Sequence, residues 1–168
     1  MQFEGIYTPL IAPFQSDFTL NSDAMALAID FLVNAGVHGI IVAGTTGEYY
    51  AMSMKERVFL MNRVKELLNN RLPLIIGTGA IRTEDSIEYA KQARIAGADA
   101  IMITTPPYAY PTGREIALHA LAIDREANLP VILYNYPGRM SVNMDEETLD
   151  RLGPVSYTHL TLPTIYSV

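Results

Sequence analysis

Hydroxyl-bearing and aromatic side chains gather directly after short apolar runs of this sequence. The segments are Thr8, GTTGE at 44–48, GTG at 77–79, TTPPY at 104–108 and YNYPGR at 134–139. Hydroxyl groups can relay protons and bind a carboxylate or a carbonyl, and backbone N–H groups just ahead of a helix, as at 44–47, can bind an anion. The set has no histidine pair and no carboxylate cluster, which disfavours a metal site. These residue types therefore indicate proton relay around a bound carboxylate or carbonyl.

Apolar runs and helix signals alternate along the chain and predict the elements that carry these segments. Strands are expected at residues 6–13, 38–43, 74–76, 100–104 and 131–134. Helices are expected at 22–35, 53–69, 83–96, 113–127 and 143–152, with caps at Asn21 or Ser22, at Ser53 and at Thr83. Strands that are apolar throughout and separated by helices are typical of a parallel sheet covered on both faces. In such folds the site lies at the carboxyl ends of the strands, which is where the polar segments fall.

A weak internal repeat supports βα units of about 30 residues. NAGVHGI at 34–40 resembles IAGADAI at 95–101, an offset of 61 residues or two such units. The pattern leaves a barrel or an open doubly wound sheet. No GxGxxG follows the first strand, which disfavours a dinucleotide-binding fold. A barrel needs eight units, and about five are present.

Composition is that of a single globular domain. The chain has 168 residues, 49% of them hydrophobic, and a formal net charge of −6. The acidic balance disfavours a nucleic-acid partner, no apolar run approaches the roughly 18 residues of a membrane span, and the N-terminus lacks a signal-peptide pattern. The absence of cysteine excludes disulfides and a thiolate nucleophile. We therefore expect one cytoplasmic domain, with neither nucleic acid nor membrane as a partner.

Three of the strand-end segments, taken in order, carry a family resemblance. GTTGE at 44–48, TPPY at 105–108 and YNYP at 134–137 resemble the dihydrodipicolinate synthase / N-acetylneuraminate lyase family, over residues 3 to about 153. Each motif is weak alone, but the three at successive strand ends are specific. The resemblance implies an α/β TIM (β/α)₈ barrel, truncated here to about its first five units. It also implies class I aldolase or lyase chemistry, in which a lysine forms a Schiff base with pyruvate or another 2-oxo acid and no separate cofactor is needed.

The resemblance assigns roles residue by residue. It makes Tyr134 the proton-shuttling tyrosine near the imine. Thr45 and Thr46 would bind the carboxylate of the 2-oxo acid, with one hydroxyl joining the tyrosine relay. Tyr108 matches a tyrosine that enters a neighbouring subunit's site, which implies a homo-oligomer, a dimer or a tetramer. Arg139 matches an arginine that receives the carboxylate of the second substrate in the synthase branch.

Each of these residues also has a purely structural interpretation. Tyr134 can be a core tyrosine with a satisfied hydroxyl, and Thr45 and Thr46 can cap the following turn. Tyr108 can pack at a surface or an interface, and Arg139 can be a solvated loop charge. The YNYP context favours the catalytic interpretation of Tyr134. The sequence leaves both interpretations open for Tyr108 and Arg139.

The lysine that this chemistry needs has no counterpart in the chain. It is expected on the sixth strand, about 30 residues after Tyr134, where the sequence reads TLPTI at 161–165. The lysines present are Lys55, Lys65 and Lys91, all in predicted helices. A lysine on the outer ring of helices should not reach the barrel axis. We therefore expect this chain to be inactive alone.

The last segment of the chain departs from the barrel pattern. VSYTHL at 155–160 looks like one reading frame of a common transposon sequencing adapter. We interpret residues 1–153 as the N-terminal part of an aldolase barrel and residues 154–168 as a non-family tail read through from such an adapter. The fifth strand would then lack a neighbour, and the chain should be poorly stable.

Smaller departures concern the second substrate. Tyr49 and Tyr50 follow GTTGE where the synthase branch has small residues, Pro107 and Ala109 replace residues of its TPYYN motif, and Ile81 stands at an asparagine position of lysine-inhibited synthases. These differences count against synthase activity and against feedback control by lysine, whereas Arg139 argues for the synthase branch. The bulk of Tyr49 suggests a different second substrate.

Two other functions stay open at this point. A phosphate-binding barrel or flavodoxin-like domain would use 44–47 or 77–79, but neither loop contains lysine or arginine, and Arg82 is the nearest cation in sequence. A non-catalytic interaction fragment made from a barrel gene is the other possibility. Stabilisation by a phosphate ligand would favour the first, and stable folding with a partner but without catalysis would favour the second.

Overall fold

Six parallel strands form one sheet in the order of the sequence. The computed structural model describes residues 3–152 and 157–161. The strands are β1 Tyr7–Pro9, β2 Gly39–Val42, β3 Leu74–Gly77, β4 Ala100–Thr104, β5 Val131–Asn135 and β6 Tyr157–Thr161. Each strand pairs in parallel with the next, and the order never reverses. A doubly wound sheet reverses its order at a switch point, so this order is that of a barrel wall.

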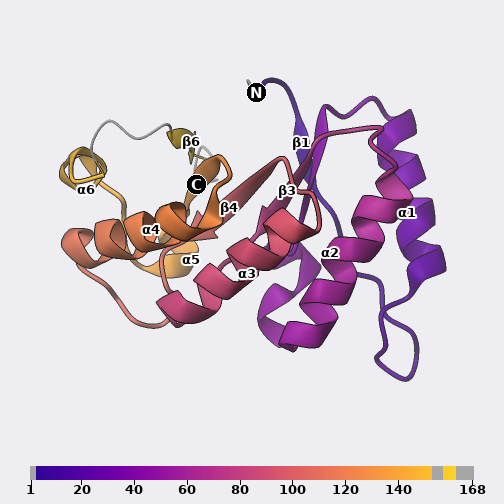
Figure 1. Cartoon of the computed structure of the whole chain (residues 1–168), viewed down its shortest axis with the longest axis horizontal. Coiled ribbons are helices and arrows are strands. Elements are labelled where there is room, and N and C mark those ends of the chain that lie inside the picture. The colour runs from indigo at the N-terminus through magenta and orange to yellow at the C-terminus, as the bar shows by residue number, and fades with distance from the viewer. Residues whose placement is uncertain (1–2, 153–156, 162–168) are drawn as a thin grey trace, which may run out of the picture.

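Helices follow the strands in turn and line one side of the sheet (Figure 1). They are α1 Ser22–Asn34, α2 Met54–Leu68, α3 Thr83–Ile95, α4 Gly113–Ala127, α5 Pro137–Met140 and α6 Glu146–Asp150, with two 3₁₀ helices, η1 Thr45–Gly47 and η2 Tyr49–Ala51. The predicted long helices are confirmed to within one or two residues. In the described part of the chain, no helix combines the length and the apolarity that crossing a bilayer requires.

Side-chain caps fix where most of these helices begin. The Asn21 side chain accepts from the Ala24 N–H of α1, and Ser53 forms the predicted capping box with Glu56 at the start of α2. Thr112 and Glu115 form a second capping box at α4. The prediction that Thr83 caps α3 is wrong. Thr83 is the first helical residue, and its hydroxyl lies 2.9 Å from His119 Nδ1.

The sheet is apolar on both faces, as predicted for parallel strands. Alternate residues such as Ile40, Leu74 and Ile101 belong to the large core between the sheet and the helices. The opposite face carries a smaller buried cluster made of Ile41, Ile75, Ala100, Met102 and Ile132. This second cluster lies where the interior of a barrel would be. The two clusters explain why the strands read as continuous apolar runs rather than alternating ones.

The prediction that β5 has an unpaired edge is wrong. Tyr157–Thr161 pairs with β5 in parallel, in a register that joins Val131 to Tyr157 and Asn135 to Thr161. A free strand edge presents a row of N–H and C=O groups, and an extended segment that follows α6 can satisfy them. Of the predicted tail at 154–168, residues 154–156 and 162–168 lie outside the described residues.

Replacement of Thr112 by alanine should destabilise the fold through α4. The change removes the hydroxyl that accepts from the Glu115 N–H, and loss of such a cap costs about 1 kcal/mol. Urea unfolding of the Thr112→Ala variant beside Ser16→Ala, an exposed loop position, measures the difference. Equal midpoints for the two variants would mean that the capping box does not contribute to stability.

Candidate active site at the strand ends

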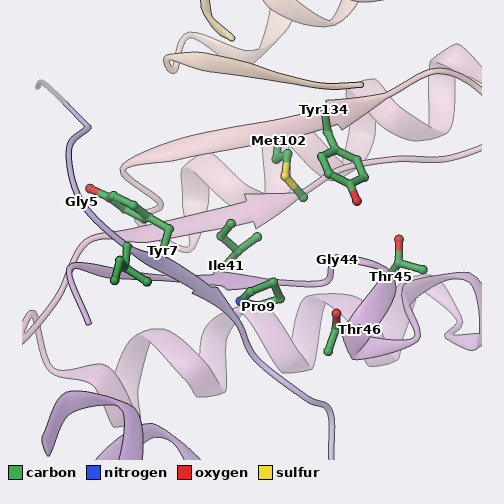
Figure 2. A pocket seen from close by; sticks show the side chains of 10 residues that line it. Gly5, Tyr7, Pro9, Ile41, Gly44, Thr45, Thr46, Met102 and Tyr134 are labelled. Atoms are coloured by element: carbon green, nitrogen blue, oxygen red, sulfur yellow. The ribbon is translucent and has the colours of Figure 1, made fainter. Parts of the chain in front are cut away.

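One cavity lies on the face of the sheet opposite the helices. It has a volume of about 340 Å³ and is lined by Gly5, Ile6, Tyr7, Pro9, Ile41, Gly44, Thr45, Thr46, Met102 and Tyr134. Figure 2 shows Thr45, Thr46 and Tyr134 at the end of the cavity where the strands finish, with the Tyr134 hydroxyl on the side of Thr45. The rest of the wall is mostly apolar. The cavity therefore has the hydroxyls of Thr45, Thr46 and Tyr134 at the end where the strands finish, and a mostly apolar wall with the Tyr7 phenol at the other end.

The two threonines lie on a short 3₁₀ turn directly after β2. The Gly47 N–H donates to the Gly44 carbonyl and the Glu48 N–H to the Thr45 carbonyl, both at 3.0 Å. The caps of η1 and η2 are Gly44 and Glu48, and neither makes a side-chain capping bond. Thr45 is partly buried and Thr46 is exposed. Neither threonine is therefore the N-cap of these two turns.

Tyr134 projects into the cavity from β5. Its backbone lies beside Thr104 of β4, and its ring lies 6.1 Å from the Tyr136 ring, centroid to centroid. Burial raises the pKa of the Tyr134 phenol, the neighbouring Tyr136 phenol raises it further, and the charge of Arg139 acts in the opposite direction. The phenol is therefore protonated near neutral pH, which is the state from which a positioned side chain can donate a proton.

Tyr108 and Arg139 lie outside the cavity wall. Tyr108 is 92% exposed and has a φ of 71°, in the loop between β4 and α4. Arg139 is exposed on α5, with its guanidinium 5.9 Å from the centre of the Tyr136 ring. Burial raises the pKa of both Tyr134 and Tyr49, and the charge of Arg139 opposes this weakly at each, so Arg139 lies within electrostatic reach of the strand ends. The structure thus places Thr45, Thr46 and Tyr134 on the wall of one cavity and leaves Tyr108 and Arg139 outside that wall.

The loop at 77–79 has the wrong polarity for an anion. The buried Arg57 guanidinium donates to the carbonyls of Gly77 and Gly79, at 2.8 and 3.0 Å, so this loop presents carbonyl oxygens to a cation. Sequence reasoning missed Arg57. A signal existed, because Arg57 stands on the same helical stripe as the buried Leu60, Met61 and Val64.

Across the described residues, no group of three histidine or carboxylate side chains is arranged to hold a metal.

Tyr49 faces a different space from the one that Thr45 lines. It is buried beside a second cavity of about 230 Å³, whose wall includes Tyr50, Arg57, Gly79 and Tyr89. Burial raises the pKa of the Tyr49 phenol, and the charge of Arg57 opposes this. An effect of Tyr49 on the second substrate stays a prediction.

Comparison with known proteins identifies relatives of this chain. The family model described as the Dihydrodipicolinate synthetase family matches residues 2–158. The 4-hydroxy-tetrahydrodipicolinate synthase of Bacillus subtilis (strain 168) is 39% identical over 152 residues, which are 90% of this chain and 52% of that protein. The corresponding enzyme of Magnetococcus marinus (strain ATCC BAA-1437 / JCM 17883 / MC-1) is 38% identical over 157 residues, 92% and 52% of the two chains. This chain spans about half the length of these relatives.

Solved structures of proteins from the same family also match the fold of this chain. The chloride-inhibited dihydrodipicolinate synthase from Acinetobacter baumannii, complexed with pyruvate, matches with a TM-score of 0.89 and 32% identity over 95% of this chain and 56% of that one. YagE, a prophage protein of the dihydrodipicolinic acid synthase family from E. coli K12 in complex with pyruvate, matches with a TM-score of 0.87 and 29% identity, over 90% of this chain and 51% of its own. The predicted family and the predicted barrel architecture are confirmed.

Tyr134 should titrate above the ordinary tyrosine pKa of about 10. Burial and the Tyr136 phenol both disfavour its phenolate. ¹³C NMR of the tyrosine ring carbons as a function of pH measures this, and a Tyr134→Phe variant assigns the signal. Titration of the assigned signal at or below the ordinary value would contradict the proton-holding environment described above.

Proposed function

Since this chain belongs to the Dihydrodipicolinate synthetase family, we propose that the parent protein is a lyase or synthase that acts on pyruvate or another 2-oxo acid through a Schiff base. The observation that carries the proposal is the meeting of Thr45, Thr46 and Tyr134 at one end of one cavity. Two structural relatives were solved in complex with pyruvate. A carboxylate beside a ketone carbonyl is the chemistry that this set of hydroxyls fits.

In this proposal the loop at 44–48, which we call the threonine loop, binds the carboxylate of the 2-oxo acid. The Thr45 and Thr46 hydroxyls line the cavity, and charge-assisted hydrogen bonds from such donors are stronger than neutral ones. The apolar wall formed by Ile41 and Met102 excludes water around the rest of the substrate. Exclusion of water strengthens each polar contact that remains.

Tyr134 would move the protons that imine formation requires. A lysine amine adds to the C2 carbonyl carbon of the 2-oxo acid, and the carbonyl oxygen leaves as water, which needs a proton delivered to that oxygen. Tyr134 lines the cavity and its phenol is protonated near neutral pH, so it would supply this proton. One threonine hydroxyl would connect it to a relay. The carbon–carbon bond to the second substrate then forms or breaks at the carbon beside the imine.

Tyr108 and Arg139 would act at the entrance of the site. An aromatic side chain that is 92% exposed is suited to cover a neighbouring subunit's cavity in a homo-oligomer. Arg139 would bind the carboxylate of the second substrate, because a guanidinium recognises carboxylates through paired hydrogen bonds. Both roles belong to the assembled parent protein.

The chain itself would bind the substrate without forming the imine. Lys55 and Lys65 lie on α2 and Lys91 on α3, where Lys91 pairs with Glu126 at 2.9 Å. The sequence has no other lysine. None of the three lines the cavity that holds Tyr134. A covalent step would therefore need a lysine from outside this sequence.

Replacement of Thr45 by valine should weaken pyruvate binding by about ten-fold or more, because a hydrogen bond to a charged group is worth about 1.5–3 kcal/mol. Saturation-transfer NMR of pyruvate with the purified chain measures the affinity. Thr19→Val, in an exposed loop that does not line the cavity, is the matched control.

Borohydride treatment separates binding from chemistry in the same samples. Mass spectrometry should find no reduced pyruvate adduct on the chain, since none of its lysines lines the cavity. An adduct on Lys55, Lys65 or Lys91 would overturn the assignment. Binding of inorganic phosphate in place of pyruvate would favour the phosphate-binding alternative.

We also propose that residues 154–168 are foreign to the parent gene, because VSYTHL at 155–160 looks like a translated sequencing adapter and the expected lysine is missing. Long-read sequencing of the source locus across codon 154 should find a reading frame that continues into a strand with a lysine. A locus that encodes Val155 to Val168 would remove the imine mechanism and leave a repurposed part of a barrel.

A further inference from the structure

Arg57 is a buried cation that the proposed chemistry does not use. Only 2% of the residue is exposed, and no ion pair within the described part of the chain includes it. Burial lowers the pKa of its guanidinium, and the phenols of Tyr89 and Tyr49 oppose this. A buried charge without a carboxylate is costly. The contacts that compensate for this cost therefore point to what the residue does.

The guanidinium contacts two glycine carbonyls and two aromatic rings. Its two terminal nitrogens donate to Gly77 and Gly79, at 2.8 and 3.0 Å. Its central carbon lies 3.4 Å from the centre of the Tyr89 ring and 5.2 Å from that of Tyr49. A planar guanidinium can make both carbonyl bonds and stack at the same time, whereas an ammonium group cannot. Arg57 thus joins α2, α3, the end of β3 and η2.

Two of these contacts lie at the two ends of the threonine loop. Gly77 lies against the start of the loop, since a Cβ on Gly77 would be 2.3 Å from the Ala43 carbonyl oxygen and 3.3 Å from the Gly44 nitrogen. Tyr49 directly follows the loop and packs beside Arg57. The backbone of residues 44–48 is therefore held before and after Thr45 and Thr46 by groups that one side chain contacts.

We propose that Arg57 is the positioning residue for the threonine loop. It fixes the Gly77 carbonyl on one side and the Tyr49 ring on the other, and this sets the direction of the Thr45 and Thr46 hydroxyls. Arg57 itself touches no substrate, because it is absent from the wall of the 340 Å³ cavity. The importance of this loop for a 2-oxo acid rests on the proposed function, but the loop's dependence on Arg57 does not.

Hydrogen exchange tests the proposal without any ligand. In an Arg57→Met variant, the amides of Gly47 and Glu48, which close the turn, should exchange roughly ten-fold faster, the factor expected for loss of one hydrogen bond to a charged group. Val64→Ala is the matched control, because Val64 is fully buried on the same helix and lies outside both cavity walls. The control should raise exchange across α2 without a selective effect on 44–48.

Two milder variants keep the test decisive if Arg57→Met fails to fold. Arg57→Lys keeps the charge but loses the paired donors, and Tyr89→Leu removes the stacked ring. Both should accelerate exchange selectively at 44–48. Exchange there that rises no more than in Val64→Ala, after correction for global stability, would overturn the proposal.

Pyruvate binding provides the second measurement. The affinity for pyruvate should fall in the Arg57 variants, and it should fall most in the variant whose amides at 44–48 show the largest rise in exchange rate. Affinity that is unchanged while exchange rises would overturn the positioning role and leave Arg57 as a purely structural residue. If the unmodified chain binds no pyruvate, the proposed function fails, and the exchange result still decides whether Arg57 orders the loop.

Discussion

The close approach of two strand ends sets the geometry on which the site depends. Gly77 at the end of β3 lies so near the Ala43 carbonyl that a side chain would require the strands to separate. Ala43 has a φ of 54°, a left-handed conformation that costs a non-glycine residue roughly 1 kcal/mol or more. Such strain persists where the surrounding structure imposes it. Here it turns the chain out of β2 so that Gly44, Thr45 and Thr46 reach the cavity.

The parallel sheet makes much of this site predictable from the sequence. Continuous apolar runs identified β2 to β5, and the capping box at Ser53 identified the start of α2. Once the strands are parallel, their carboxyl ends must lie at one edge. Thr45 and Tyr134 are therefore brought together by topology although 88 residues separate them along the chain. The same reasoning gives no distance between them, because side-chain direction depends on packing.

The features that were missed depend on contacts between elements. Arg57 reads as an ordinary charge within a helix, and only its position on the buried stripe with Leu60 and Val64 indicates otherwise. The pairing of β6 with β5 was missed because Tyr157–Thr161 was interpreted by its likeness to a translated sequencing adapter rather than as an extended segment beside a free edge. The first helical residue of α3 was misassigned as its cap, since the Thr83 hydroxyl meets His119 from α4 instead.

Barrel enzymes draw their reacting groups from the ends of several strands, so binding and covalent chemistry can belong to different stretches of one sequence. In this chain the binding and proton-transfer candidates lie on β2, β5 and the loops after them, within residues 44–48 and 134–139. The loop at 44–48 is held by contacts among β2, β3, α2, α3 and η2, and none of those contacts involves β6. Tyr134 instead lies on β5, which pairs with both β4 and β6. The threonine loop can therefore keep its geometry when the nucleophile is missing. Under the proposed function, this part of the barrel wall would keep recognition of a 2-oxo acid, and turnover would require the complete barrel.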